Sequence, residues 1–212
     1  MRIDVFSDVV CPWCFVGKRH LEGALAEAQI TDPEIHWHAF QLNPDLPPEG
    51  RDRREYLREK FGSDFNTERL HGRVAEAGKG AGIEFKFDKI TRSPNTFNAH
   101  RLIQLAQTQG LGNQLTETLF RAYFLQGRDL GDSATLAELG REAGVPGDLG
   151  QFLAGEEQAD AVRNDLNTAR EIGIGGVPFF ILENRYTLSG AQPVSLFVQA
   201  LKAAQQKSRN VN

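Results

Sequence analysis

The segment Val9-Val10-Cys11-Pro12-Trp13-Cys14 contains the only two cysteines of this 212-residue chain. Two thiols three positions apart can form and break one disulfide bond with little movement of the backbone. The preceding residues 2–7 are short, β-branched and aromatic, which predicts a strand, and the residues after Cys14 show helical periodicity. The sequence therefore places the cysteine pair where a strand gives way to a helix.

Pro12 predicts that this helix begins directly after Cys11. Proline suits the first helical position, because its missing N–H would have no partner there. Cys11 is then the N-cap residue, with its sulfur near the unpaired N–H groups and the positive end of the helix dipole. A thiolate is favoured at this position, so Cys11 is predicted to be the attacking group. Cys14, one turn further in, is predicted to be the shielded thiol that resolves a mixed disulfide.

The composition is that of an ordinary globular protein, with 40% hydrophobic and 25% charged residues. A net charge of -4 gives no electrostatic basis for binding nucleic acid or an anionic membrane surface. No apolar run approaches the roughly 18 residues of a membrane span, so no membrane partner is expected. The basic cluster at residues 51–54 is interpreted as a solvated helix start.

The N-terminus lacks an uninterrupted apolar stretch, because Asp4 and Asp8 fall within it. We therefore expect a cytoplasmic location, where thiols are kept reduced and a cysteine pair is typically catalytic, redox-sensing or metal-binding. Two simpler interpretations are a pair of small buried side chains and half of a zinc site with His36 and His38. The absence of a second cysteine pair favours redox chemistry, and no metal is predicted.

The order of the expected elements begins with a β-α-β unit. Residues 15–29 continue the first helix and residues 34–40 form the second strand. Residues 41–50 contain three prolines and leave the unit as a loop. Helical periodicity dominates from residue 51 to about residue 173, with one short extended piece expected at residues 83–87.

Strand patterns return near the C-terminus. Residues 179–182 and 186–188 predict antiparallel strands joined by a tight turn, and Pro193 opens a last amphipathic helix. This order predicts an α/β fold in which a helical domain is inserted into an α/β domain. The expected boundaries are residues 1–45 and 174–212 for the α/β domain and residues 46–173 for the insertion.

A second motif, Gly175-Gly176-Val177-Pro178, directly precedes a predicted strand. The bond between Val177 and Pro178 is a candidate for the cis isomer. A cis bond would present the Val177 N–H and C=O outward, where an extended substrate chain could pair with them and hold its cysteine against Cys11. We expect Val177, Pro178, Pro12 and Trp13 to contact substrate, Trp13 by supplying apolar area.

Together these motifs resemble the DsbA family of thioredoxin-fold oxidoreductases. Residues 8–17 (DVVCPWCFVG) and 95–101 (NTFNAHR) are similar to the FrnE-type subgroup, and the resemblance runs over essentially the whole chain. It implies a thioredoxin-like domain with a large inserted all-helical domain. It also implies a protein disulfide oxidoreductase or isomerase that acts on protein or peptide thiols and disulfides.

The resemblance implies roles for individual residues. Cys11 is the nucleophile, Cys14 the resolving residue, and Val177-Pro178 the cis-proline loop beside them. No bound cofactor is implied besides the Cys11–Cys14 disulfide, and glutathione is a candidate electron partner. Because Pro12-Trp13 replaces the Pro-His of the strongly oxidising periplasmic member, a milder potential is expected.

Proton transfer to Cys14 is expected to differ from the family pattern. Many thioredoxin-fold enzymes carry a buried acid six residues before the nucleophile, and Val5 occupies that position here. Asp4 and Asp8 are nearby but are expected on the other face, because side chains alternate along a strand. Water is therefore the expected route for the proton.

Asn98 and His100 are candidates for lining a cleft near Cys11. The alternative is a structural role with satisfied hydrogen bonds, because His100 lies just off the apolar stripe of its predicted helix. His20 and His71 are expected to be solvated.

Two other functions remain open. The kappa-class transferases and hydroxychromene-carboxylate isomerases resemble this layout but have serine at the first motif position. A glutathione-dependent isomerase or transferase is therefore the first alternative, although a cysteine with a second cysteine to resolve it favours disulfide chemistry. The second alternative is a holdase-like chaperone with secondary redox activity.

Overall fold

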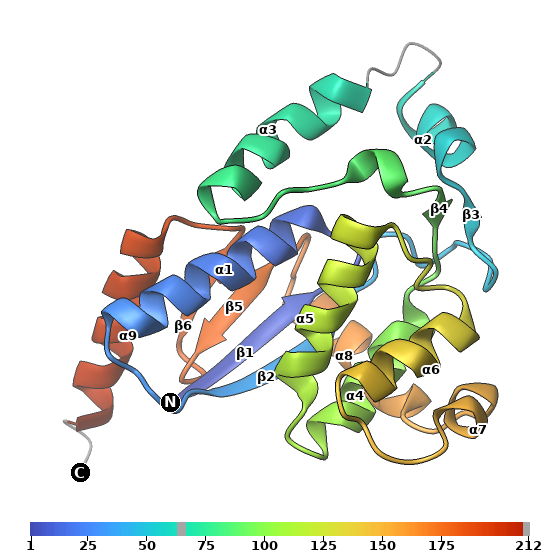
Figure 1. Ribbon diagram of the computed structural model, residues 1–212. Helices are drawn as coiled ribbons and strands as arrows, with labels where there is room; N and C mark the ends of the chain where they lie inside the picture. The colour runs from blue at the N-terminus through green and yellow to red at the C-terminus, as the bar shows by residue number, and fades with distance from the viewer. Residues whose placement is uncertain (63–66, 210–212) are drawn as a thin grey trace.

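The computed structural model describes residues 1–62 and 67–209. Its centre is a small sheet with helices packed around it (Figure 1). No helix in these two stretches is both long and apolar enough to cross a membrane. The helices, in chain order, are α1 (Pro12–Glu27), α2 (Arg53–Phe61), α3 (Thr67–Gly80), the 3-10 helix η1 (Phe87–Lys89), α4 (Phe97–Gln107), α5 (Gly112–Arg121), the π-helix η2 (Ala122–Gln126), α6 (Ser133–Glu142), α7 (Leu149–Ala154), α8 (Ala159–Glu171) and α9 (Val194–Arg209).

The sheet has four strands in the order β2-β1-β5-β6. Strand β1 (Arg2–Ser7) is parallel to β2 (Glu34–Ala39) and antiparallel to β5 (Phe179–Leu182). Strand β6 (Tyr186–Ser189) is the antiparallel partner of β5. The predicted strands are confirmed, and the two ends of the chain share one sheet. This pairing brings the cysteine segment after β1 next to the proline loop before β5.

A second, two-stranded sheet joins β3 (Arg51–Asp52) to β4 (Arg92–Ser93). The prediction of an extended piece at residues 83–87 is wrong, because no strand forms there. The aromatic side chains that suggested it pack against another ring instead: Phe85 and Phe87 both make T-shaped contacts with Phe124. The strand of this region lies at β4.

The inserted helices share a core with α1. Phe15 of α1 stacks on Phe120 of α5 with 5.1 Å between ring centroids, and Trp37 of β2 meets the same ring edge-on at 6.4 Å. One continuous cluster of buried residues runs from the sheet into the helices. At the rim, Lys18 and Arg19 of α1 both contact Glu117 of α5.

A partly buried charge network ties β1 and β2 to α8. His38 lies between two carboxylates, with Nδ1 2.7 Å from Asp165 and Nε2 2.8 Å from Asp4, and Arg2 also binds Asp4 at 2.7 Å. Burial acts to lower the pKa of His38, but the hydrogen bonds to Asp165 and Asp4 outweigh it and raise that pKa to about 9. Burial acts to raise the pKa of Asp4, yet His38 and Arg2 hold it well below its ordinary value. The imidazolium therefore stabilises the fold.

We predict that His38→Gln lowers the free energy of unfolding by roughly 2–3 kcal/mol at pH 6, at about 1.36 kcal/mol per pKa unit. The folded-state pKa lies above the ordinary value of 6.5, so this stability is fully present below pH 6.5 and is lost as the pH rises through about 9. Denaturant titrations across this range measure it. The control is His36→Gln on the same strand, because His36 pairs only with the exposed Glu34. Equal effects of the two substitutions would contradict the prediction.

Candidate active site

Cys11 occupies the N-cap of α1, as predicted from Pro12. Its backbone is extended, with φ −90° and ψ 110°, and Pro12 takes the first helical position. The Cys14 N–H donates to the Cys11 carbonyl at 3.0 Å, and the Cys11 N–H donates to the Asp8 carbonyl at 2.9 Å. The cap has no side-chain hydrogen bond to the helix. Pro12 has no N–H and the Cys14 N–H is already bonded, so the Trp13 N–H and the positive end of the helix dipole remain to favour a negative charge at the sulfur.

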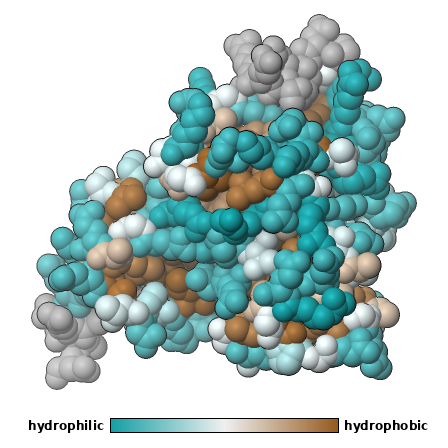
Figure 2. Space-filling model, in the orientation of Figure 1, coloured by the Kyte–Doolittle hydropathy of each residue, from teal (hydrophilic) through white to brown (hydrophobic). Residues whose placement is uncertain are grey.

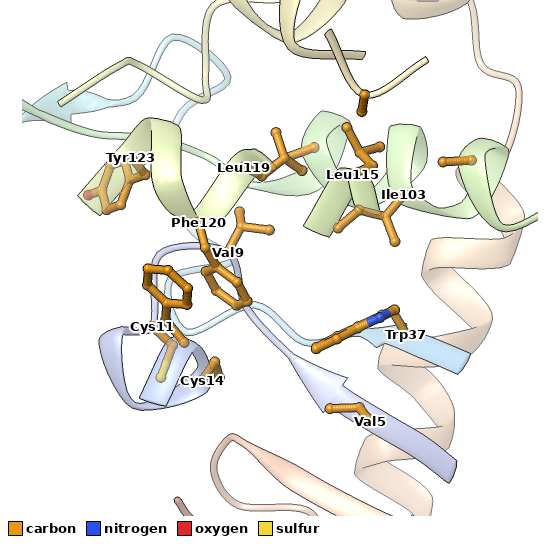
Figure 3. Close-up of a cluster of buried hydrophobic side chains, with 14 of the residues drawn as sticks. Val5, Val9, Cys11, Cys14, Trp37, Ile103, Leu115, Leu119, Phe120 and Tyr123 are labelled. Atoms are coloured by element: carbon orange, nitrogen blue, oxygen red, sulfur yellow. The ribbon is translucent and has the colours of Figure 1, made fainter. Parts of the chain in front are cut away.

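Both cysteines are free thiols and both are buried, Cys11 with 4% and Cys14 with 1% of its surface exposed. The difference in exposure that was expected between them is therefore small. The two thiols differ more in their surroundings. The Cys11 thiol donates to the Val177 carbonyl at 3.5 Å, whereas Cys14 lies under Phe120, which reaches down from α5 (Figure 3).

The environment of Cys14 keeps its proton in place. Burial raises the pKa of the Cys14 thiol well above its ordinary value, and its hydrogen bond with Cys11 and the charge of Cys11 raise it further. The Ser7 side chain and the Asp8 backbone N–H act in the opposite direction. A thiol of this kind is inert until its proton is removed.

The proline loop lies directly against the first turns of α1. The Val177–Pro178 peptide bond is cis, Pro178 is buried and Val177 is half-buried. Gly17 allows this close approach: a Cβ at Gly17 would stand 2.9 Å from Pro178 Cγ and 3.1 Å from Phe180 Cζ. The fold thus brings Cys11, Val177 and Pro178 together.

A cavity of about 240 Å³ opens beside the motif, with Val10, Pro12 and Trp13 in its wall. Trp13 is 40% exposed. Figure 2 shows a mostly hydrophilic face with apolar side chains gathered below α3. The cavity forms where the cysteine segment meets the inserted helices.

The cavity wall contains residues that the sequence analysis missed or misplaced. Arg53, Lys60 and His71 line it, and no acidic side chain of the described residues does. The expectation that the cluster at residues 51–54 is solvated fails for Arg53, whose Nη1 donates to the Tyr123 hydroxyl at 3.2 Å. The signal in the sequence was the helical spacing of Arg53, Tyr56 and Lys60, which puts them on one face of α2.

His71 is half-buried, so the expectation that it is solvated is wrong. Its ring stacks on Phe87 with 4.0 Å between centroids. Burial and the neighbouring charge of Arg53 lower the pKa of His71 to about 4. The positive charge of the cavity at neutral pH therefore comes from Arg53 and Lys60. His20 also has a partner, since its Nδ1 lies 2.8 Å from the Gln192 carbonyl oxygen.

Asn98 and His100 differ from the expected lining of an open cleft. Asn98 is half-buried and accepts a hydrogen bond from Arg101 at 2.9 Å. The same guanidinium also donates to the backbone carbonyl of Phe152 in α7. His100 is only 3% exposed. It lies inside the protein because α4 packs against the sheet.

The histidines of the alternative zinc site are engaged elsewhere. His36 pairs with Glu34, and His38 lies between Asp4 and Asp165. Across residues 1–62 and 67–209, no group of three or more His, Cys, Asp or Glu side chains is arranged to hold a metal ion.

Comparisons with known proteins agree with the fold. The family model of the DSBA-like thioredoxin domain matches residues 2–202. The chain is 28% identical to the protein YwbO of Bacillus subtilis (strain 168) over 98% of both chains. A structure of a probable DsbA oxidoreductase from Streptomyces coelicolor is 31% identical, with a TM-score of 0.87 over 97% of this chain and 90% of that one. The predicted family and thioredoxin-like fold are confirmed.

A more distant relative shares the fold alone. The cytosolic disulfide reductase DsbM from Pseudomonas aeruginosa, solved with GSH, is 20% identical. Its TM-score is 0.65 over 99% of this chain and 98% of that chain.

We predict that Gly17→Ala lowers the free energy of unfolding by roughly 1–2 kcal/mol, because the added methyl group must push Pro178 or Phe180 away. Gly23→Ala is the matched control on the same helix. Its Cβ would meet only Val194, at the ordinary contact distance of 3.5 Å, and alanine should stabilise the helix by up to about 1 kcal/mol. Thermal and denaturant unfolding of both variants tests this. A Gly17 variant as stable as the wild type would show that the close approach is not required.

Proposed function

Because this chain belongs to the DSBA-like thioredoxin domain family, we propose that it is a thiol-disulfide oxidoreductase whose exchanging pair is Cys11 and Cys14. The observation that carries the proposal is the chemical asymmetry of the pair. Cys11 caps a helix N-terminus, at the positive end of the helix dipole, and Cys14 is a buried thiol whose pKa is raised by burial and by Cys11. Cys11 is therefore suited to attack the substrate, and Cys14 is suited to remain protonated until the mixed disulfide is resolved.

The reaction has two exchange steps. The Cys11 thiolate attacks a substrate disulfide, forms a mixed disulfide and releases one substrate sulfur as a thiolate, which takes a proton from solvent. Cys14 then loses its proton and attacks the Cys11 sulfur, so that the second substrate sulfur leaves. The substrate disulfide is reduced to two thiols and the enzyme dithiol is oxidised to one disulfide. The reverse sequence oxidises a substrate dithiol.

The proline loop and Trp13 are the proposed contacts for a protein or peptide substrate. Val177 presents backbone groups next to Cys11, where an extended chain can pair with them as an added strand. Trp13 offers exposed apolar area on the other side of the motif. Pro12, which lies between the two cysteines, contributes to the same surface.

Glutathione is the proposed electron partner. The cavity beside Trp13 has a volume of about 240 Å³ and carries the charges of Arg53 and Lys60. A small peptide thiol with free carboxylates complements that charge. We further propose a cytoplasmic, FrnE-type role with no resident cofactor and no metal. Cys14 favours this disulfide chemistry over a glutathione-dependent isomerase or transferase, which needs no resolving thiol.

We predict that Cys11→Ser abolishes the reduction of insulin by the protein, since the attacking sulfur is removed. Cys14→Ser should instead accumulate a mixed disulfide, because the first step proceeds and the second cannot. Mass spectrometry of non-reduced, acid-quenched samples measures the trapped adduct. A Cys11 variant that retains insulin reduction would overturn the proposed function.

A second prediction concerns Lys60 at the mouth of the cavity. Lys60→Gln should raise the KM for oxidised glutathione about two- to fivefold, in line with about 0.5–1 kcal/mol for one exposed charge. The KM for the neutral hydroxyethyl disulfide should not change. Lys79→Gln is the control, because Lys79 is exposed on α3 and, among the described side chains, pairs with Glu76 alone. Equal changes for both disulfides would argue against the anionic substrate.

A further inference from the structure

A buried polar cluster at the end of β1 has no part in the steps above. Ser7 is 4% exposed, Asp8 0% and His100 3%. In the part of the chain that the structure describes, Ser7 Oγ, Asp8 Oδ1 and His100 Nε2 have no hydrogen-bond partner. Each unsatisfied buried group destabilises the fold. With Nε1 of Trp37, which lines the same small cavity, four such atoms gather in one place, and they call for a function.

Ser7 and His100 border a small cavity, and Asp8 lies beside His100. His100 Nε2 lies 3.4 Å from Asp8 Oδ1, while the other carboxylate oxygen of Asp8 accepts a hydrogen bond from the Leu42 N–H at 2.8 Å. Ser7 and His100 line a cavity of about 10 Å³ together with Thr116. This volume is at the lower limit for one water molecule, and polar groups are available to bind it.

One end of the cluster reaches the resolving cysteine. The Ser7 side chain and the Asp8 backbone N–H both act on the Cys14 thiol in the direction of the thiolate. The other end is the pair of His100 and Asp8. The cluster thus extends from the buried thiol to a base and a carboxylate that solvent does not reach.

We propose that Ser7, the cavity and the His100–Asp8 pair form a proton path for the Cys14 thiol. The proposal rests on the disulfide exchange proposed above and concerns its second step. The Cys14 proton passes through the Ser7 hydroxyl and a water in the cavity to His100, whose charge Asp8 balances. The Cys14 thiolate then attacks Cys11, the Cys11–substrate bond breaks, and the substrate thiolate takes a proton from solvent. In this path Ser7 relays the proton, His100 accepts it, and Asp8 positions His100 and balances its charge.

Other titratable groups face this cluster. Burial raises the pKa of Tyr123 to about 12, and the Asp8 charge adds to that effect, so Tyr123 stays protonated. His38 lines the same small cavity from β2 and has a pKa of about 9, set by Asp165 and Asp4 against the effect of burial. Cys11 approaches from α1 through its N–H bond to the Asp8 carbonyl. Below pH 8 neither Tyr123 nor His38 changes its charge appreciably.

The test is a single-turnover experiment in which reduced protein is mixed with a stoichiometric peptide disulfide and quenched with acid between pH 5.5 and 8. Mass spectrometry then follows the mixed disulfide and the oxidised enzyme separately. In His100→Gln and Asp8→Asn we expect the mixed disulfide to form at the wild-type rate. The rate at which the mixed disulfide is resolved should fall roughly 10- to 100-fold at pH 7. In these variants that rate should increase steeply with pH, as when hydroxide removes the proton.

Thr116→Val is the matched control, because it alters the same cavity wall and removes only a hydrogen bond to Gly112 within α5. It should retain the wild-type pH profile. Ser7→Ala is a smaller change at the end of the path nearest Cys14. If the other two variants do not fold, the pH profile of Ser7→Ala tests the proton path. Folded variants that resolve with the wild-type pH profile would overturn the proton path. A wild-type protein that forms no mixed disulfide at all would instead overturn the proposed function.

Discussion

Burial of the Cys14 thiol beneath the helical insertion is the constraint on which the rest of the site depends. Phe120 covers the cysteine segment from α5, and its ring is held by Phe15 and Trp37 (Figure 3). This packing raises the pKa of Cys14 and leaves Cys11 at the helix end, against the Val177 carbonyl. The chemical difference between two neighbouring thiols therefore comes from aromatic packing that involves distant parts of the chain.

The insertion consequently does more than cover the sheet. It supplies Arg53 and Lys60 to the cavity beside Trp13, and it supplies His100 to the buried cluster behind Cys14. Its contact with α1 is made by stacked rings inside and by charged side chains at Glu117 outside. Because the same helices pack the core and line the cavity, a change in their packing would alter both the thiols and the proposed substrate surface.

Local chemistry made much of this arrangement predictable from the sequence. Pro12 marks the helix start, the alternation of apolar residues marks the strands, and both depend only on neighbouring residues. The positions of His71 and His100 depend on which helix packs against which, and a single sequence does not specify that. The pattern at residues 83–87 misled for the same reason, since aromatic rings that pack on Phe124 look like strand residues when their partner is unknown.

His38 and His100 show how hydrogen bonding separates a structural role from a chemical one. His38 has a carboxylate at each ring nitrogen, within 2.7 and 2.8 Å, so its proton is held and its pKa rises to about 9. His100 has one carboxylate at 3.4 Å without a formed hydrogen bond and a cavity beside it. A histidine whose proton is fixed on both sides contributes stability, whereas one with an unsatisfied nitrogen can accept and release a proton. In the proposed path, His100 is connected to the Cys14 thiol through the cavity and Ser7.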